Sequence, residues 1–287
     1  MLDNNQILKF KRDGYIHLKK FFNDNEVNNF LQGVEKKKIS IEKDKIDKTV
    51  DIDEMWNFIC HSKMLNIVRS LIGQKIFYMH DASILNSETN KTLNHTWHRD
   101  NPCRKTGFGP DWNSKEKYNV VSSAVYLTES DSTLNIIKKS HLKGYRFSFS
   151  NLLRIIHLKL RKLKKFNFLK DLIELIIGTN LKYGAGDLII FYTTLFHAGS
   201  VIKNSNNSYR EGFISRYAGE GLHCQTFLNY EMNYRKSNEK YKISKKREIF
   251  FQKLRDNNIY ISTDIKKDHI DGVFLPKENH SDSIYKL

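Results

Sequence analysis

A short polar run, residues 94–103 (NHTWHRDNPC), carries residue types that bind metal ions. His98 and Asp100 are two positions apart, and in a strand such residues lie on one face with Cα atoms about 6–7 Å apart. An imidazole and a carboxylate at that separation can bind one ion together. Iron(II) in oxygenases takes two histidines and one carboxylate on a single face of its octahedron. The run therefore supplies two of three ligands and needs a second histidine from elsewhere.

Among the eleven histidines of the chain, His197 is the best candidate for the missing ligand. It follows GAGDLIIFYTTLF, which predicts a turn, a buried strand and a short loop, so His197 begins the next strand and can face a barrel interior. His141 lies in a lysine-rich turn and is expected to be exposed. His95 has the wrong parity to share a face with His98 unless the strand bulges. A lone H-x-D pair or a lone core histidine is common, and only the ordered set favours a metal site.

A downstream arginine completes that set. Arg210 follows His197 by thirteen residues, and the Asn/Ser-rich run between them predicts a hairpin that returns the chain beside His197, with Arg210 near the metal. A guanidinium can hold a carboxylate through two parallel hydrogen bonds. Arg216 lies six residues further on the same strand face and is the competing candidate. The alternative for either arginine is a surface salt bridge to Glu211 or Glu220.

The elements that must position these residues are short strands preceded by helices. Apolar spacing predicts helices in NNQILKFKRDG, NDNEVNNFLQGVEKK and SKMLNIVRSLIG, the last closed by Gly73, with a short strand at Tyr15–Leu18. From about residue 75 the pattern changes to strands, in KIFYMHDASILN, LNHTWHRD, NVVSSAVYLT, TLNIIKK, GDLIIFYTT, FHAGSVI and YREGFISRYAG. Together these predict a mainly β fold, a sandwich or jelly roll with helices packed outside.

A basic helical insert at about 144–182 interrupts the strands. Apolar residues fall on one helical face and basic residues on the other, namely Leu152, Ile156, Leu160, Leu163 and Phe166 against Arg154, Arg161, Lys164 and Lys165. Such a helix can lie on an anionic membrane or bind a phosphorylated partner. The alternative is a helical hairpin whose apolar face covers the barrel while its lysines are solvated. No linker divides the chain, so residues 1–287 are predicted to form one domain, with a lysine-rich, partly helical tail from 231.

Composition limits the class of protein. The formal charge of +16 favours anionic partners, unless it reflects only a Lys-, Asn- and Ile-rich composition. No run of eighteen apolar residues or signal-peptide core occurs, and three cysteines form no C-x-x-C pair, so a cytoplasmic protein is expected. The basic cluster falls on a predicted helix and not on aromatic-rich strands, which argues against a nucleic-acid-binding module.

These motifs together resemble the phytanoyl-CoA dioxygenase family of iron(II)/2-oxoglutarate-dependent oxygenases. The resemblance runs through ILKFKRDGYIHLKKFFNDNEVNNF, TWHRDNP, SSAVYLTESDSTLNIIKKSHLKG and the segment from GAGDLIIFY to ISRYAG. It implies a double-stranded β-helix, the cupin-like jelly roll, with His98, Asp100 and His197 on Fe(2+) and Arg210, or else Arg216, on 2-oxoglutarate. The chain departs from the family's pattern where Lys138-Lys139 replace a Pro-Gly pair, and in its long basic insert.

The resemblance also implies a chemistry. Fe(2+), 2-oxoglutarate and O2 would together convert a substrate C–H bond to an alcohol while the cosubstrate becomes succinate and carbon dioxide. Related halogenases lack the carboxylate ligand, so the presence of Asp100 indicates hydroxylation or another oxidation. The net charge and the insert favour a small anionic substrate, such as a phosphorylated or nucleotide-linked sugar, a phosphonate or a lipid-linked saccharide. The alternative is a catalytically silent jelly-roll binding protein.

Overall fold

A computed structural model of the chain describes residues 2–41, 52–88, 97–100, 119–130, 132–160, 166–201, 209–220 and 245–261. Its helices are α1 (Asn4–Asp13), α2 (Asp24–Ile41), α3 (Asp53–Ile59), α4 (Ser62–Ile72), the 3-10 helix η2 (Lys143–Phe147), α6 (Phe149–Leu160), α7 (Asn167–Ile177) and α9 (Lys245–Asp256). Its strands are β1 (Tyr15–Leu18), β2 (Ile76–Glu88), β3 (Val120–Tyr126), β4 (Ser132–Ile136), β5 (Thr179–Lys182), β6 (Leu188–Tyr192), β7 (His197–Val201), β8 (Tyr209–Gly219) and β9 (Ile259–Tyr260). None of these helices is long and apolar enough to cross a bilayer.

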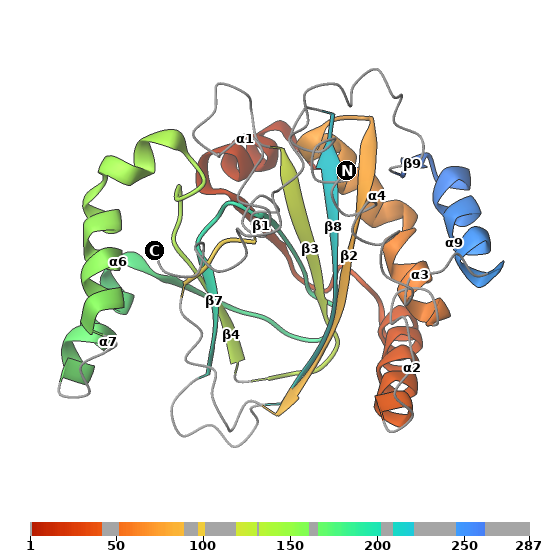
Figure 1. Cartoon of the computed structure of the whole chain (residues 1–287), viewed down its shortest axis with the longest axis horizontal. Coiled ribbons are helices and arrows are strands. Elements are labelled where there is room, and N and C mark those ends of the chain that lie inside the picture. The colour runs from red at the N-terminus through yellow and green to blue at the C-terminus, as the bar shows by residue number, and fades with distance from the viewer. Residues whose placement is uncertain are drawn as a thin grey trace, which may run out of the picture.

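The strands form two sheets. The larger sheet has the order β1-β6-β3-β8-β2-β9, and the smaller one has the order β5-β4-β7. All pairs are antiparallel except β2 with β9. A single antiparallel bridge joins His98 to His197 and so adds the H-x-D segment to the edge of the smaller sheet. This arrangement, shown in Figure 1, is the jelly roll with outer helices that the sequence predicts.

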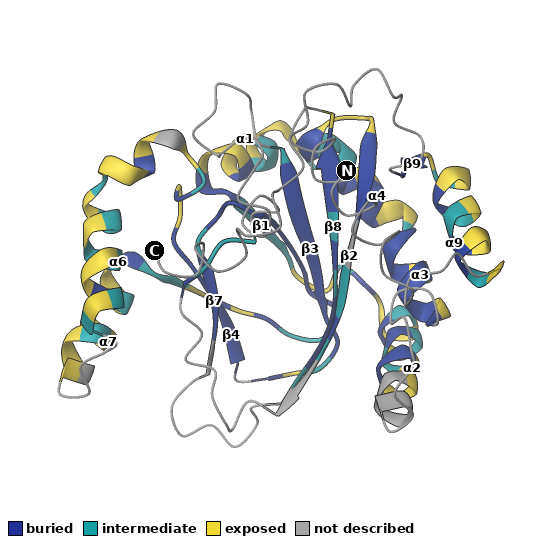
Figure 2. Cartoon of the chain, in the orientation of Figure 1, coloured by how far each residue is buried: buried dark blue, intermediate teal, exposed yellow. Residues whose placement is uncertain are grey.

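The helices cover the outer faces of both sheets. Residues of α1 to α4 and α9 share one core cluster with strands of the larger sheet, including Phe10, Phe30, Met64 and Phe250. The pair α6 and α7 lies at the opposite side of the molecule, next to β7 (Figure 1). Figure 2 shows the strands of both sheets largely buried between these helical layers, while α6 and α7 carry extensive exposed surface.

Burial along the strands shows which faces are available for a site. All residues of β3 and β6 are buried, as expected for strands in the middle of a sheet that is covered on both faces. Along β8 the faces alternate: Phe213 and Tyr217 are fully buried, whereas Arg210 and Arg216 are only half-buried. The rings of Phe30 and Phe58, from α2 and α3, lie within 6 Å of Phe213. The two arginines therefore occupy the face of β8 opposite the helices.

Gly14 brings the N-terminal helix against the loop that leads to His197. It ends α1 in the left-handed conformation, with φ of 91°, which glycine adopts without strain. A Cβ at this position would lie 2.6 Å from the Leu195 side chain and 2.5 Å from the His141 ring. Only a residue without a side chain therefore fits between α1 and the loop.

The predicted helical insert consists of η2, α6 and α7, but it does not pack as the hairpin interpretation expected. Leu153 and Leu160 pack towards the barrel, in a cluster with Trp97 and Ala198. Three residues that the sequence placed on the barrel-facing side are exposed instead, namely Leu152, Ile156 and Phe166; Leu163 lies outside the described residues. The reason is that α6 carries apolar residues around most of its circumference, so apolar spacing alone did not identify the packed face.

Three elements were not predicted from the sequence. Helix α3 spans only seven residues, β5 lies inside the segment expected to be helical, and β9 has two residues. Each is too short for its apolar period to be distinguished from a turn. The prediction that β7 and β8 form a hairpin was wrong, because these two strands belong to different sheets. The Asn/Ser-rich run between them lies outside the described residues.

Replacing Phe213 by alanine tests how far the helical layer depends on β8. Because the ring is fully buried among Phe30, Phe58 and Gly33, we expect the free energy of unfolding to fall by about 3–5 kcal/mol. Ile249→Ala, at a side chain that is 53% exposed on α9, is the matched control and should cost about 0.5 kcal/mol or less. Equal losses in urea denaturation would contradict this packing.

Candidate metal centre

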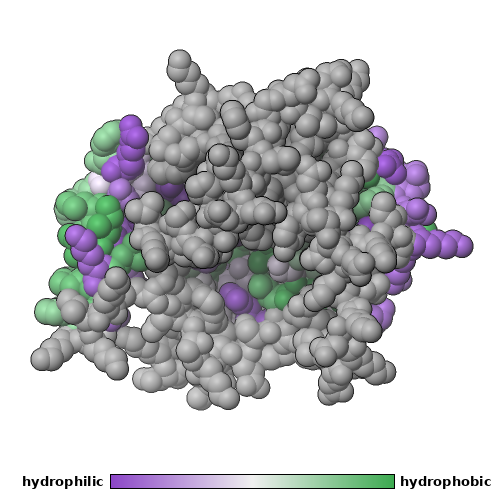
Figure 3. Space-filling model, in the orientation of Figure 1, coloured by the Kyte–Doolittle hydropathy of each residue, from purple (hydrophilic) through white to green (hydrophobic). Residues whose placement is uncertain are grey.

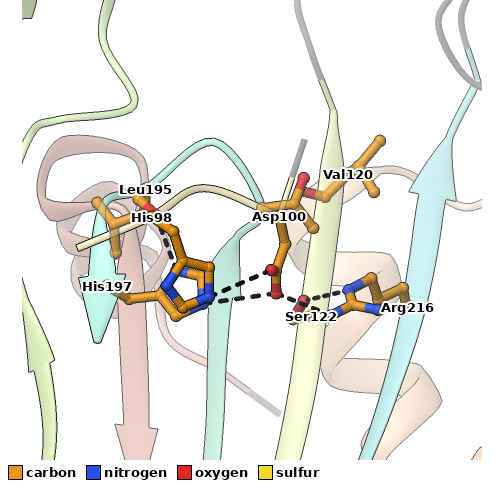
Figure 4. A network of polar contacts seen from close by, with 8 residues as sticks. His98, Asp100, Val120, Ser122, Leu195, His197 and Arg216 are labelled. Carbon is orange, nitrogen blue, oxygen red and sulfur yellow. Dashed lines mark hydrogen bonds and ion pairs between the residues drawn. The ribbon is translucent and has the colours of Figure 1, made fainter. Parts of the chain in front are cut away.

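Three side chains that the sequence singled out converge at the end of β7. His98, Asp100 and His197 each offer a ligand atom, and these atoms all lie within 4.8 Å of one another. His98 Nε2 is 3.6 Å from Asp100 Oδ1, and His197 Nε2 is 3.5 Å from Asp100 Oδ2. Figure 4 shows the two imidazole rings side by side, with the carboxylate facing both. Two imidazoles and one carboxylate are the donor set that non-haem iron(II) takes on one face.

Backbone hydrogen bonds hold the two histidines at the same level. The His98 amide donates to the His197 carbonyl oxygen at 2.9 Å, and the His197 amide donates to the His98 carbonyl oxygen at 3.0 Å. Residues paired directly across antiparallel strands have neighbouring side chains, and the ring centroids of this pair are 4.4 Å apart. The bridge therefore brings together two residues that are about a hundred positions apart in the chain.

The residues between and beside the ligands point the other way, as the H-x-D pattern predicts. Trp97 is buried and its ring lies 5.1 Å from that of His157 on α6. The Arg99 guanidinium lies 4.0 Å over the Phe196 ring and donates to the Ser140 carbonyl oxygen at 2.7 Å. Trp97 thus contacts the insert and Arg99 contacts Phe196 and Ser140, while His98 and Asp100 remain available on the other face.

The orientation of His197 is fixed by the loop before it. Its Nδ1 lies 3.0 Å from the Leu195 carbonyl oxygen, which can only accept, so Nδ1 carries the proton. The lone pair is then on Nε2, the atom that faces Asp100. Histidine ligands of metals are commonly oriented by a hydrogen bond of this kind. Gly14 contributes indirectly, because it leaves room for the Leu195 side chain.

Asp100 is held as a carboxylate. Burial by itself raises its pKa, but the neighbouring His197, Arg216 and His98 favour the charged form more strongly, so the pKa lies well below the usual range. The Arg216 Nη2 donates to Asp100 Oδ2 at 2.8 Å, and its Nε donates to Ser122 Oγ on β3 at 3.1 Å. The carboxylate is therefore a charged donor with a defined orientation.

Arg210 has a different environment from Arg216. Its charge lowers the pKa of Tyr126 and Tyr183, although burial raises the pKa of both phenols by more. These two rings stack at 3.5 Å between centroids. Arg210 Nε is buried and makes no hydrogen bond with any described residue. The guanidinium therefore keeps donor capacity that Arg216 has already used on Asp100 and Ser122.

The structure also places other residues that the sequence singled out. Arg216, the competing candidate, contacts Asp100 at 2.8 Å and so lies beside the ligand set; which arginine binds 2-oxoglutarate stays a prediction. His141 is half-buried, stacks on the Tyr192 ring at 5.0 Å and donates from Nε2 to the Lys11 carbonyl oxygen. His95 lies outside the described residues. Ser122 and the Leu195 carbonyl could not be found from the sequence, because a polar residue in a buried strand and a backbone oxygen belong to no motif.

The comparisons with known proteins agree with this geometry. The sequence model of the family described as phytanoyl-CoA dioxygenase (PhyH) matches residues 10–152. No curated protein matches the chain significantly. Among solved structures, the non-heme alpha ketoglutarate dependent epimerase SnoN from nogalamycin biosynthesis is similar, with a TM-score of 0.51 and 16% identity over 75% of this chain and 81% of its own.

Two further structures show the same similarity. EctD from S. alaskensis, solved with 2-oxoglutarate and 5-hydroxyectoine, has a TM-score of 0.53 and 16% identity over 76% of each chain. AviO1 from Streptomyces viridochromogenes has a TM-score of 0.53 and 15% identity over 77% of this chain and 97% of its own. At such identities the similarity establishes the fold, which is the double-stranded β-helix.

Fold and site together define the class of the protein, the non-haem iron(II)/2-oxoglutarate-dependent oxygenases. Within that class, the chain belongs to the phytanoyl-CoA dioxygenase family.

Alanine variants of the three ligand candidates test whether they bind one metal ion. We expect His98→Ala, Asp100→Ala and His197→Ala each to weaken Co(II) binding by at least about 100-fold, because losing a ligand costs more than the 10–100-fold typical of an outer hydrogen-bond partner. Titration of the apoprotein, followed by the visible absorption of bound Co(II), measures the affinity. His141→Gln is the control and should bind Co(II) like the unchanged protein; an equal loss there would mean that the three residues are not the metal site.

Proposed function

We propose that this protein is an iron(II)- and 2-oxoglutarate-dependent dioxygenase that hydroxylates, or otherwise oxidises, a small anionic metabolite. The observation that carries the proposal is the convergence of His98, Asp100 and His197 on the inner face of the barrel. Iron(II), 2-oxoglutarate and O2, when bound, supply the oxidation of a C–H bond. The residues of the chain bind and orient these groups.

The donor set suits iron(II) for reasons of charge and geometry. Two neutral imidazoles and one carboxylate neutralise half of a divalent charge and leave ligand positions open. The Leu195 carbonyl selects the His197 tautomer whose Nε2 can bind a metal ion. Arg216 and Ser122 hold the Asp100 carboxylate in place, so the carboxylate does not need to reorganise when an ion binds.

Arg210 is the better candidate to hold the far carboxylate of 2-oxoglutarate. Arg216 is already paired with a carboxylate at 2.8 Å, whereas Arg210 forms no ion pair with a described residue and has a buried donor without a partner. The two arginines lie on one face of β8. With its keto-acid end at the metal, 2-oxoglutarate would place its far carboxylate on the Arg210 side of this face. Tyr126 and Tyr183 are buried, and the charge of Arg210 acts on both phenols.

Charge indicates the class of substrate. The net charge of +16 and the basic insert favour an anion such as a phosphorylated or nucleotide-linked sugar, a phosphonate or a lipid-linked saccharide. The carboxylate of Asp100 occupies a position that a halide would need, which favours hydroxylation. The alternative is a catalytically silent binding protein, in which the carboxylate and the two imidazoles would hold a structural metal or none.

Turnover without a known substrate tests the proposal. Anaerobic addition of iron(II) and 2-oxoglutarate should produce a weak visible charge-transfer band, and admission of O2 should then release succinate slowly. Asp100→Ala and His197→Ala should abolish both signals, because each loses a metal ligand. A protein that binds Co(II) but gives neither band nor succinate would be the silent binding protein.

Arg210→Gln tests which arginine holds the cosubstrate. We expect its KM for 2-oxoglutarate to rise about 30-fold or more, since truncating one partner of a buried charge pair typically costs about 2 kcal/mol or more. Arg255→Gln, at an exposed position of α9, is the charge-matched control and should leave KM unchanged. Arg216→Gln should chiefly weaken metal binding. If only Arg216→Gln raised KM, the assignment would have to be exchanged.

A further inference from the structure

The outer surface of the insert is unusually apolar for a surface exposed to water. Of the fifteen large apolar side chains that are exposed among the described residues, twelve lie between Leu142 and Ile176. Figure 3 shows apolar side chains gathered at the left edge of the molecule, where Figure 1 places α6 and α7, with hydrophilic side chains among them. Single exposed apolar residues are normal, but a contiguous group of this kind marks a surface that binds something.

The spacing shows that this surface is a helix face and not a set of scattered residues. The exposed apolar residues of α7 are Phe168, Leu169, Leu172, Leu175 and Ile176. They follow the spacing i, i+1, i+4, i+7 and i+8, which is typical of the helix face that packs against a core. In α6 they are Phe149, Leu152, Ile155 and Ile156. The other sides of the two helices already pack on the barrel through Leu153, Ile173 and Ile177. We call the nine exposed residues the apolar face of the hairpin.

The hairpin that carries this face is held in a fixed relation to the barrel. His157 on α6 lies 2.8 Å from Glu174 on α7, which joins the two helices to each other. The same histidine ring lies 5.1 Å from Trp97, the residue before the ligand candidate His98. The face is therefore presented by a packed element.

Charge indicates which kind of partner covers the face. The segment 144–182 contains nine lysines and arginines against two acidic residues, and the whole chain has a net charge of +16. Arg146 and Lys159 are exposed beside the apolar residues. A second copy of the chain would bring two such basic segments together and be repelled, whereas an anionic lipid surface would attract them while accepting the apolar side chains. Helices that are too short to cross a bilayer can still lie in its interface.

We propose that the apolar face of the hairpin docks this protein peripherally on an anionic lipid bilayer. Phenylalanine and leucine side chains of α6 and α7 enter the boundary between headgroups and acyl chains, and basic residues of the insert contact acidic headgroups. The proposal does not depend on the metal chemistry, because it rests on the exposure and charge of the insert alone.

Sedimentation with lipid vesicles tests the proposal on the full-length protein. We expect the protein to bind vesicles of phosphatidylglycerol and phosphatidylcholine in equal parts at low salt, and to bind pure phosphatidylcholine vesicles at least tenfold more weakly. High salt should weaken the binding to anionic vesicles, since the charge attraction is screened.

Matched variants distinguish binding through the apolar face from nonspecific binding through other exposed apolar residues. Phe168→Ser with Leu175→Ser changes side chains that are 82% and 77% exposed, so the fold should be kept while vesicle affinity falls at least tenfold. Leu8→Ser with Ile249→Ser removes exposed apolar side chains elsewhere (61% and 53% exposed) and should leave the affinity unchanged. Arg146→Gln with Lys159→Gln should reduce the preference for anionic vesicles, whereas Lys9→Gln with Lys11→Gln on α1 should not.

Three results would overturn the proposal. One is no binding to anionic vesicles by a protein that is monomeric in light scattering. Another is a dimer that Phe168→Ser with Leu175→Ser dissociates, which would assign the face to a second copy. The third is equal binding to neutral and anionic vesicles. In all three cases succinate release in solution would remain a separate measurement, so a failure here leaves the oxygenase proposal to its own test.

Discussion

The candidate centre depends on one antiparallel bridge of two backbone hydrogen bonds between His98 and His197. It joins the H-x-D segment to the first residue of β7 and places two imidazole rings at the same height. Asp100 then follows automatically, because residue i+2 returns to the face of residue i. The remainder of the jelly roll supports this bridge: β7 is held by β4, and the loop before it is packed against Gly14. Without the bridge, His197 would not be held beside the segment that carries His98 and Asp100.

Charge is distributed unevenly along the inner face of β8, and this gives the two arginines different roles. Arg216 is neutralised by Asp100, so its main effect is to keep that carboxylate ionised and oriented. Arg210 lies among tyrosines and has no described carboxylate partner. Its Nε is buried without a hydrogen-bond partner among the described residues, and a buried donor in this state is costly unless a ligand supplies an acceptor. On the same strand, Arg216 thus holds the Asp100 carboxylate, whereas Arg210 has a free donor with which it could bind a ligand.

Much of the architecture could be predicted from the sequence, and the exceptions have physical causes. The strand patterns around Val120–Tyr126, Leu188–Tyr192 and Tyr209–Gly219 were long enough to show their period, and the family motifs identified the fold that the comparisons confirm. The pairing of β7 and β8 was wrong, because local spacing cannot say which sheet a strand joins. His98, Asp100 and His197 were identified by parity and by position after a buried strand, whereas Ser122 and the Leu195 carbonyl had no pattern to reveal them.

The strict alternation of residues 97–100 has a consequence for how such proteins can diverge. Trp97 packs against His157 and Arg99 packs against Phe196. Their neighbours His98 and Asp100 point to the other face, towards the candidate centre. One short stretch of backbone is therefore constrained on both faces, by packing against the hairpin and Phe196 on one and by the candidate metal centre on the other. A lineage that exchanged the hairpin for another element would have to supply new packing for the Trp97 indole, or else the segment that carries His98 and Asp100 would lose its outer support. Changes in the hairpin are in this way limited by the need to keep His98 and Asp100 in place.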